Sequence, residues 1–445
     1  MLGGGTAGMT VVDEAAANGW EVAVVEAKAL GGTCVNNGCI PTKTMIHSAK
    51  IMHYIQRAKE YGIECGSPRM DFTAVLARKD RLITAMRDGL YRDVAQNKKI
   101  MLFEGTAAFE EPMRVWAGSE LIEGERILIC TGARTLIPPI EGLDTVDYLT
   151  STTALQMKEL PASLIIAGGG PIAVEFAQMY ARFGVNVTIL QRPARLVPNV
   201  EPEISAELQR VLEQDGVNII TGADVRKVGR NLAGITVFAE VEGAPRQFAS
   251  DRIMVATSRK PNSDTLQLDK AGVETDKRGY IRVDSAFRTN VPGIWALGDA
   301  TGGAMFTHRA WHDGFLLSRY FFKGELISTA GRLIPYAIFT DPEIAAVGLG
   351  EQAAWGAGHD VTVLQTPFKH VSRAMAMAEE DGLIKLVVDG KNGKLLGAHL
   401  IGPNSGEIIH ELVAAIRFNA TVYDLQDMLH IHPTLAEGIN AAAFS

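Results

Sequence analysis

The sequence is poor in cysteine and has no long apolar run. Only four cysteines occur in 445 residues, at positions 34, 39, 65 and 130, which excludes a secreted domain held together by disulfides. No apolar run reaches the roughly 18 residues of a membrane-spanning helix, and the N-terminal MLGGGTAG lacks the basic and apolar regions of a signal peptide. We therefore expect a cytoplasmic protein, in which a disulfide serves chemistry rather than stability.

A strong excess of charge of one sign is also missing. The formal net charge is -8 and is spread along the chain, so no basic stripe is available to bind a nucleic acid backbone. The composition, 47% hydrophobic and 21% charged, is that of a soluble globular protein. The length suggests about two to four domains. We expect neither a nucleic acid nor a membrane as a partner.

The chain opens with a glycine-rich pattern. Gly3, Gly5 and Gly8 have GxGxxG spacing and are followed by an alanine-rich segment and the apolar stretch EVAVVE, which ends at Glu26. Such glycines let the backbone approach a pyrophosphate at a helix N-terminus, and the acid accepts hydrogen bonds from ribose hydroxyls. Only Met1 and Leu2 precede the glycines, where a strand of about five residues is usual. We expect that the natural start lies upstream; a tolerated stub is the alternative.

A second pattern of the same kind follows. SLIIAGGGPIAVEFA leads an apolar strand into Gly168, Gly170 and Ala173 at GxGxxA spacing, and the next strand, NVTIL, ends at Gln191 and Arg192. Two such patterns predict two dinucleotide-binding folds in one chain. ILICTGA and RIMVATSRKPN read as further apolar strands with small polar residues at their ends, which suits turns close to a cofactor.

Two features lie nearer the C-terminus. Asp299 follows the apolar strand of GIWALGDAT, at the strand end where open α/β sheets bind ligands, although a helix-capping role is the alternative. From about Pro335 the strands IKLVVD and KLLGAHLIG alternate with helices, which predicts a separate α+β domain. This domain ends in HIHPTLAEGINAAAFS, which carries His432 and Glu437.

GGTCVNNGCIPTK contains the closely spaced pair Cys34 and Cys39. A zinc site would need a second pair of ligands, and none accompanies these cysteines. A structural bridge across so short a loop would remove little chain entropy. A redox-active pair needs neither further metal ligands nor a large entropy gain. Its position also favours this role, because the pair follows Glu26 closely and a helix dipole there would lower a thiol pKa beside a bound nucleotide. We expect Cys65 and Cys130 to be ordinary buried thiols.

These motifs together resemble a known family. GGTCVNNGCIPTK, the two glycine fingerprints, ALGDAT, YAIFTDPEIAAVG and HIHPTLAE are similar to the pyridine-nucleotide-disulfide oxidoreductases, the group of dihydrolipoamide dehydrogenase, glutathione reductase and mercuric reductase. The resemblance covers essentially the whole chain. It implies an α/β fold with two Rossmann-like domains and a C-terminal α+β dimerisation domain. The implied boundaries are 1–151 with 276–334 for FAD, 152–275 for NAD(P)H and 335–445 for dimerisation.

The resemblance also implies residue roles. Electrons would pass from NAD(P)H through FAD to the Cys34–Cys39 disulfide, with Cys39 facing the flavin and Cys34 attacking the substrate. His432 and Glu437 would form an acid/base dyad that reaches the cysteines of the other subunit, which implies an obligate homodimer with shared active sites. The implied FAD residues are Gly3, Gly5, Gly8, Glu26, Thr33, Lys43, Thr131, Gly132, Asp299, Phe306 and Thr307. The implied NAD(P)H residues are Gly168, Gly170, Ala173, Glu175, Gln191, Arg192 and Ser258.

The nicotinamide preference rests on one position. Gln191 stands where an NADH-specific fold usually has an acid, and Arg192 and Arg195 could pair with a 2′-phosphate. We therefore expect NADPH, with NADH as the alternative if these arginines are merely solvated. Ser258 departs from the glycine usual in the family at the nicotinamide side.

The substrate is the least constrained property. NNGCIPTKTMIHSAKI resembles relatives of mercuric reductase, but the sequence ends in AAAFS without a cysteine pair, and His432 replaces a tyrosine, so Hg(II) is in doubt. GDATGGAMFT and AAFS are also similar to a mercuric-reductase-like flavoprotein that resists reactive chlorine and reduces Cu(II). We expect a disulfide or thiophilic metal ion as substrate. The alternatives are a dihydrolipoamide dehydrogenase and a non-catalytic flavin-binding protein.

Overall fold

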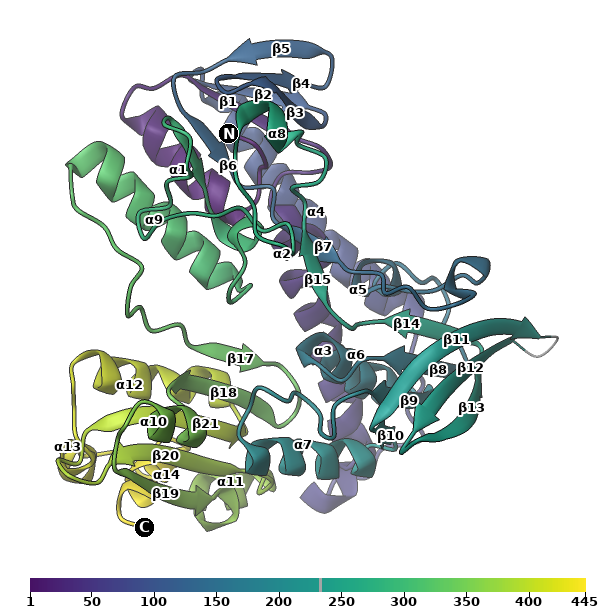
Figure 1. Cartoon of the computed structure of the whole chain (residues 1–445). Helices are drawn as coiled ribbons and strands as arrows, with labels where there is room; N and C mark the ends of the chain where they lie inside the picture. Colours follow the sequence, from purple (N-terminus) through teal and green to yellow (C-terminus); the bar gives the residue numbers. More distant parts are fainter. Residues whose placement is uncertain (232–233) are drawn as a thin grey trace. The chain divides into compact units, whose positions relative to one another are not determined.

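The computed structural model describes residues 1–231 and 234–445, which form two compact units (Figure 1). The first unit comprises Met1–Thr44, Ala74–Ile137 and Ser258–Arg332. The second comprises Met45–Thr73, Pro138–Thr257 and Leu333–Ser445. Helix α3 (Cys39–Gln56) begins in the first unit and ends in the second.

A parallel sheet forms the centre of the first unit. Strand β1 pairs with β2, and β6 pairs with β16, both in parallel. A meander of β3, β4 and β5 and the antiparallel pair β7 and β15 complete the strands described there. The elements of this unit are α1 (Thr6–Ala17), β1 (Val22–Glu26), α2 (Gly32–Asn37), α4 (Phe72–Gln96, whose first residues belong to the second unit), β2 (Ile100–Glu104), β3 (Ala107–Glu111), β4 (Arg114–Ala117), β5 (Glu120–Glu123), β6 (Ile127–Ile129), β7 (Ala133–Thr135), β15 (Arg259–Pro261), α8 (Leu268–Ala271), β16 (Ile294–Ala296) and α9 (Thr307–Lys323).

Leu2 takes the place of the expected first strand. It forms parallel bridges to both Val25 and Ile129, and so joins β1 to β6. Its backbone N–H donates to Leu128 O at 2.8 Å, and its carbonyl accepts from Cys130 N at 2.8 Å. Its side chain is only 2% exposed. The described chain therefore closes this sheet with a two-residue stub.

Helices α1 and α9 lie side by side on this sheet (Figure 1). Their close approach depends on Gly314, where an added Cβ would lie 2.6 Å from Ala7 O. Apolar side chains of both helices pack with residues of β6 and β16 in one buried cluster. The packing fixes the beginning of α1 and the beginning of α9 on the same body.

The described residues of the second unit form three sheets. A parallel sheet has the order β10–β9–β8–β14, a three-stranded antiparallel sheet has the order β11–β12–β13, and a five-stranded antiparallel sheet has the order β17–β18–β21–β20–β19. The elements are α5 (Ser151–Ala154), β8 (Ser163–Ala167), α6 (Pro171–Arg182), β9 (Asn186–Gln191), α7 (Pro202–Gln214), β10 (Asn218–Thr221), β11 (Ala223–Asn231), β12 (Gly234–Val241), β13 (Ala244–Ser250), β14 (Arg252–Val255), β17 (Tyr336–Ile338), β18 (Glu343–Gly348), α10 (Glu351–Gly356), β19 (Val361–Pro367), α11 (Ser372–Met377), β20 (Leu383–Asp389), β21 (Leu395–Gly402), α12 (Ser405–Arg417), α13 (Val422–Asp427) and α14 (Glu437–Ala443).

The two kinds of sheet in this unit follow from their sequences. The strands β8 and β14 are apolar runs, as expected for parallel strands covered on both faces. The strands β20 and β21 are buried almost throughout and pack against α12 and α14 around a large apolar core. The predicted fold class, with two Rossmann-like domains and a C-terminal α+β domain, is confirmed. The predicted domain boundaries stay predictions.

Candidate active site

The first glycine turn leads from the Leu2 stub into α1. Gly3 has a φ of +105°, and an added Cβ would lie 2.5 Å from Cys130 O; at Gly8 it would lie 2.5 Å from Gly3 O. At Gly5, the N-cap of α1, the nearest atom to an added Cβ is Gly32 Cα at 3.9 Å. Gly3 and Gly8 therefore shape the turn, whereas Gly5 leaves open space in front of the helix.

This open space suits a pyrophosphate. The N-terminus of α1 has neither a side-chain cap nor an acidic residue in its first turn, so its free N–H groups and the helix dipole favour an anion. The Glu26 carboxylate lies beside the turn, where Oε2 accepts from Gly4 N at 2.7 Å and Oε1 accepts from Lys28 N at 2.8 Å. These contacts hold an acid in the place predicted for a ribose partner.

Thr131 and Asp299 also fit a bound FAD; together with the other residues predicted to contact FAD they are called the FAD cradle below. Thr131 Oγ1 is buried and has no hydrogen-bond partner among the residues that the structure describes. A buried hydroxyl of this kind calls for a ligand or a water as its partner. Burial raises the pKa of the Asp299 carboxyl, and the charges of Arg259 and Arg309 oppose this rise. Asp299 lies in a 3-10 turn (Gly298–Thr301) and is not the N-cap residue of that turn or of α9. The residues present therefore fit a bound flavin nucleotide.

The remaining predicted FAD residues also lie in the first unit. Thr33 is on α2, Lys43 is on α3, and Gly132 has a φ of +67° in the turn between β6 and β7. Phe306 is the N-cap residue of α9, and Thr307 is its first residue. The first unit thus contains every residue predicted to hold FAD.

The cysteine pair lies at the junction of two helices. Cys34 is on the six-residue helix α2, and Cys39 begins the eighteen-residue helix α3, with Gly38 between the helices. Both side chains are half-buried. Cys39 Sγ lies 3.2 Å from Thr307 Oγ1, which joins the pair to the predicted FAD cradle.

The pKa of Cys34 is raised in this structure, whereas the lowering of a thiol pKa by a helix dipole stays a prediction for the pair. A hydrogen bond with Cys39 and burial raise its pKa, against smaller opposing effects of Thr307 and Lys43. The helix that carries Cys34 is short, so its dipole lowers the pKa of this thiol only weakly. Cys34 therefore holds its proton more strongly than an ordinary thiol in this structure.

The other two cysteines differ from each other. Cys130 is buried, as predicted, at 7% exposure, and burial raises its pKa to about 12. Cys65 is exposed, so its predicted burial is wrong; it follows a 3-10 turn at Ala58–Tyr61 in a surface segment. In residues 1–231 and 234–445, no group of three or more His, Cys, Asp or Glu side chains could hold a metal ion.

The second glycine turn in the other unit repeats the first. Gly168 has a φ of +113°, and an added Cβ would lie 2.5 Å from Ala256 O, whereas Gly170 has nothing within 4 Å. Gly170 is the N-cap of α6, which has no side-chain cap and no acidic residue in its first turn. Ala173 is fully buried at the third position of the pattern. The turn again leaves room for a phosphate at a helix N-terminus.

The end of β9 carries the residues predicted to choose the nicotinamide. Gln191 is 5% exposed, and its Nε2 donates to Arg195 O at 3.2 Å. Arg195 Nη2 donates to Pro198 O at 2.7 Å, and Arg192 is exposed. Arg192 is therefore more available than Arg195 to bind a phosphate, because the Arg195 guanidinium is already bonded to the backbone of its own loop.

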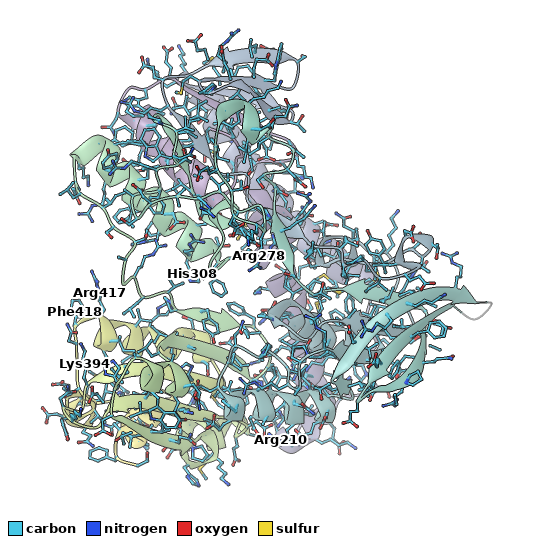
Figure 2. The ribbon with its side chains drawn as sticks, viewed as in Figure 1. Arg210, Arg278, His308, Lys394, Arg417 and Phe418 are labelled. Atoms are coloured by element: carbon cyan, nitrogen blue, oxygen red, sulfur yellow. The ribbon has the colours of Figure 1, made fainter. Side chains whose placement is uncertain are left out.

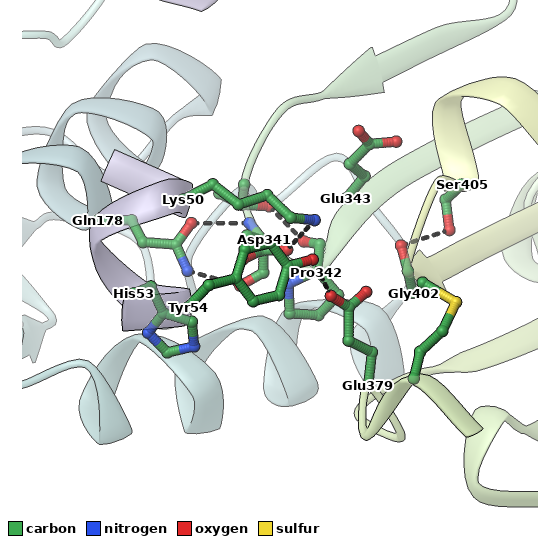
Figure 3. A network of polar contacts seen from close by, with 12 residues as sticks. Lys50, His53, Tyr54, Gln178, Asp341, Pro342, Glu343, Glu379, Gly402 and Ser405 are labelled. Carbon is green, nitrogen blue, oxygen red and sulfur yellow. Dashed lines mark hydrogen bonds and ion pairs between the residues drawn. The ribbon is translucent and has the colours of Figure 1, made fainter. Parts of the chain in front are cut away.

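A polar network on α6 was not predicted from the sequence. Gln178 forms two hydrogen bonds with the backbone of Asp341 (Figure 3). Gln178 Nε2 donates to Asp341 O at 2.6 Å, and Gln178 Oε1 accepts from Asp341 N at 2.7 Å. The Asp341 carboxylate accepts from Lys50 at 2.9 Å and from Arg182 at 2.7 Å. Glu175, predicted to contact NAD(P)H, accepts from Phe339 N at 2.9 Å. The signal available was a set of polar residues at helical spacing, 175, 178 and 182, in an otherwise apolar helix.

The predicted acid/base dyad is formed. His432 Nδ1 lies 2.9 Å from Glu437 Oε1, and Glu437 Oε2 accepts from Thr434 N at 2.8 Å. The Thr434 N–H and the His432 ring lower the pKa of Glu437. His432 is 69% exposed, so its Nε2 edge faces outward and can meet a group outside this unit.

The predicted site residues divide between the units. Cys34, Cys39 and the FAD residues lie in the first unit, and the dyad lies in the second with all predicted NAD(P)H residues except Ser258. Ser258 lies in the first unit, where its carbonyl accepts from Leu136 N at 3.0 Å.

Comparison with known proteins decides the family. The family model described as pyridine nucleotide-disulphide oxidoreductase matches residues 1–314, and that of its dimerisation domain matches residues 334–443. The chain belongs to this family. The pyridine nucleotide-disulphide oxidoreductases use FAD and a pyridine nucleotide, so this chain is a flavin-dependent oxidoreductase.

Relatives of two activities are similar to this member of the family. A mercuric reductase from Staphylococcus aureus is 36% identical over 445 residues, covering 100% of this chain and 81% of the relative. A dihydrolipoyl dehydrogenase from Thermus scotoductus is 33% identical over 453 residues, covering 100% and 96%. The solved structure of the HOCl-induced flavoprotein disulfide reductase RclA from Escherichia coli has a TM-score of 0.91 at 33% identity, covering 100% and 98%. Among the helices that the structure describes, none is both long and apolar enough to cross a membrane.

Proposed function

We propose that this chain uses reduced nicotinamide, preferably NADPH, to reduce the Cys34–Cys39 disulfide, and that the resulting dithiol reduces a disulfide or thiophilic metal-ion substrate. The hydride of NAD(P)H and a proton convert the disulfide into two thiols. Exchange with a substrate disulfide then re-forms the Cys34–Cys39 bond and releases two substrate thiols. Bound FAD supplies the two-electron relay between the nicotinamide and the sulfurs.

The observation that carries this proposal is the contact between Cys39 Sγ and Thr307 Oγ1, at 3.2 Å. It attaches a redox-capable thiol pair to the first residue of α9, within the cradle that fits a flavin nucleotide. Thr307 also bonds Cys34, so this contact joins the pair as a whole to the cradle, and the proposal that Cys39 is the thiol on the cofactor side rests on the resemblance to the family. Cys34, on the separate helix α2, is the thiol that attacks the substrate.

His432 and Glu437 supply the proton transfer. Glu437 orients the imidazole through Nδ1 and leaves Nε2 free to take a proton from Cys34 and return it to the departing substrate thiol. We propose that His432 of the partner subunit serves the cysteines, so that a homodimer is the working form. The presence of the family's dimerisation domain supports this arrangement.

The nicotinamide preference rests on Gln191 and Arg192. A neutral amide at the end of β9 cannot accept from a 2′-hydroxyl as strongly as a carboxylate, and the exposed Arg192 can pair with a 2′-phosphate. We therefore propose NADPH as the preferred donor.

The relatives support the proposed substrate class. One similar chain is a mercuric reductase, and another is solved as a disulfide reductase induced by HOCl and as its Cu(II) complex. A dihydrolipoamide dehydrogenase is the second candidate, because the His432–Glu437 dyad is present and such enzymes are 33% identical. Gln191 argues against it. The predicted cytoplasmic location stays a prediction.

A substrate panel tests the proposal. Purified protein with bound FAD is mixed in a stopped-flow instrument with NADPH or NADH and then with organic disulfides, lipoamide, Cu(II) or Hg(II). We expect faster reduction by NADPH, and turnover that is lost in Cys34→Ala but kept in Cys65→Ala, whose exposed thiol lies outside the site. Rapid oxidation of dihydrolipoamide by NAD+ would instead identify a dihydrolipoamide dehydrogenase. A protein that stays colourless with added FAD would be a non-catalytic relative.

A further inference from the structure

Arg309 stands where a cation is unfavourable. It lies in the first turn of α9, which begins at Thr307, and the positive end of the helix dipole is at this end. Its side chain is only 11% exposed, so water provides little compensation. A charge kept in such a place needs specific partners.

The acceptors of its two terminal nitrogens lie on one loop, residues 301–304. Nη1 donates to Gly302 O and to Ala304 O, the latter at 3.2 Å, and Nη2 donates to Thr301 Oγ1 at 3.0 Å. Asp299 belongs to the same loop, in its 3-10 turn Gly298–Thr301. A guanidinium presents several donors in a fixed plane, which suits three acceptors on one short segment.

Asp313, one turn further along α9, balances the charge. It is fully buried, and Oδ2 lies 3.4 Å from Arg309 Nε, while Oδ1 lies 2.7 Å from Arg332 Nη2. Asp313 Oδ2 also accepts from Gly298 N at 3.1 Å. Two side chains of α9 therefore hold the loop on both sides of Asp299, one before it and one after it.

We propose that Arg309 is a positioning residue for FAD, which holds the loop carrying Asp299 against the start of α9 so that Asp299 and Thr307 face one ligand. Its positive charge also favours the ionised form of the half-buried Asp299 carboxyl. This inference rests on the flavin dependence of the family and not on the substrate proposed above.

Arg309→Met and Arg309→Lys test the proposal in reconstituted apoprotein. The fold should survive both changes, because Arg332 and Gly298 N remain partners of Asp313. We expect Arg309→Met to raise the Kd for FAD, measured by flavin fluorescence, by about tenfold or more, and Arg309→Lys to raise it less, since Lys keeps the charge but not the planar fork. We also expect a shift of the flavin absorption bands in Arg309→Met.

Arg319→Met is the matched control on the same helix. Its guanidinium pairs with Glu325 and lies 5.6 Å from the centre of the Phe315 ring, so it does not hold the loop. We expect its FAD affinity to be that of the wild type. The proposal is overturned if Arg309→Met binds FAD with unchanged Kd and spectrum, or if the affinity falls only together with the melting temperature of the apoprotein. Neither readout uses a substrate, so failure of the proposed reductase activity would leave this result intact.

Discussion

At the residue scale, Glu437 orients the imidazole that carries out the proposed proton transfer. Its carboxylate accepts from Thr434 N at 2.8 Å and bonds His432 Nδ1 at 2.9 Å, and these contacts lower its pKa. It is therefore ionised at neutral pH and fixes which ring nitrogen stays free. We expect His432→Gln to lower turnover by about 100-fold or more, as for loss of a general acid/base, and Glu437→Gln to lower it by a smaller factor. Steady-state turnover against pH measures both.

His359→Gln provides the comparison for this pair. His359 Nδ1 also bonds a carboxylate, Asp389, at 2.9 Å, but no role in the site is predicted for it. Its substitution should leave turnover at the wild-type value. If His432→Gln kept the wild-type rate and pH profile while His359→Gln did not, the dyad would be assigned to the wrong residue.

At the element scale, the two glycines of the β8–α6 turn should fail in different ways. Ala at position 170 meets nothing within 4 Å, so Gly170→Ala should fold normally and lose affinity for NAD(P)H, because its methyl group occupies the phosphate space. Ala at position 168 would lie 2.5 Å from Ala256 O at a φ of +113°. Gly168→Ala should therefore lower the melting temperature. Nicotinamide titration and thermal unfolding separate the two; equal melting temperatures would refute the distinction.

The buried Lys385 predicts a second effect at this scale. This β20 side chain is 0% exposed, and its Nζ lies 2.7 Å from Glu201, 3.1 Å from Glu203 and 2.7 Å from Glu351. Lys385→Met would leave these carboxylates without their cation. We expect it to destabilise the protein by about 3 to 5 kcal/mol, seen as a lower urea midpoint.

The same cluster sets a pH dependence. Lys385 and neighbouring groups lower the pKa of Glu201 against the effect of burial. A depressed folded-state pKa contributes stability that is complete above the unfolded value, about 4.3. This stability is lost as the pH falls through the lower folded value, so wild type should weaken below about pH 4.3. Arg210 on α7 forms half-exposed ion pairs with Glu207 and Asp381, and Arg210→Met, which breaks them, should change stability by about 1 kcal/mol at most. A loss as large as that of Lys385→Met would contradict this account.

The strand β8 and the helices α2, α3 and α6 show what sequence patterns can and cannot predict. Apolar runs and glycine spacing were enough for β8, α6 and the turn between them, because those signals are local. Three other features depend on residues that are distant in the sequence. They are the break at Gly38 between α2 and α3, the exposure of Cys65, and the network of Gln178 with Asp341. Their residue types allow several environments, so only the packed structure decides among them.

At the scale of the whole molecule, large apolar side chains remain exposed on the C-terminal domain. Leu429 is 98% exposed, Ile431 and Phe418 are 80% exposed, and Phe444 is 65% exposed (Phe418 in Figure 2). Leu429 and Ile431 are close neighbours in the chain, and exposed apolar side chains that lie together mark interaction surfaces. These residues fall within or directly after the match to the family's dimerisation domain, residues 334–443. Leu429 and Ile431 also lie close in the chain to the exposed His432, which is proposed to serve the partner subunit.

Leu429→Asp combined with Ile431→Asp should therefore separate the subunits, because a dimer would bury both new charges. We expect light scattering to report the mass of one chain, FAD to stay bound because its predicted residues lie in the first unit, and disulfide turnover to be lost. Leu326→Asp is the control: this leucine is 97% exposed but lies in the first unit, so mass and turnover should not change. A double variant that is monomeric and turns over at the wild-type rate would show that each chain completes its own site, and His432 of the partner subunit would have no role.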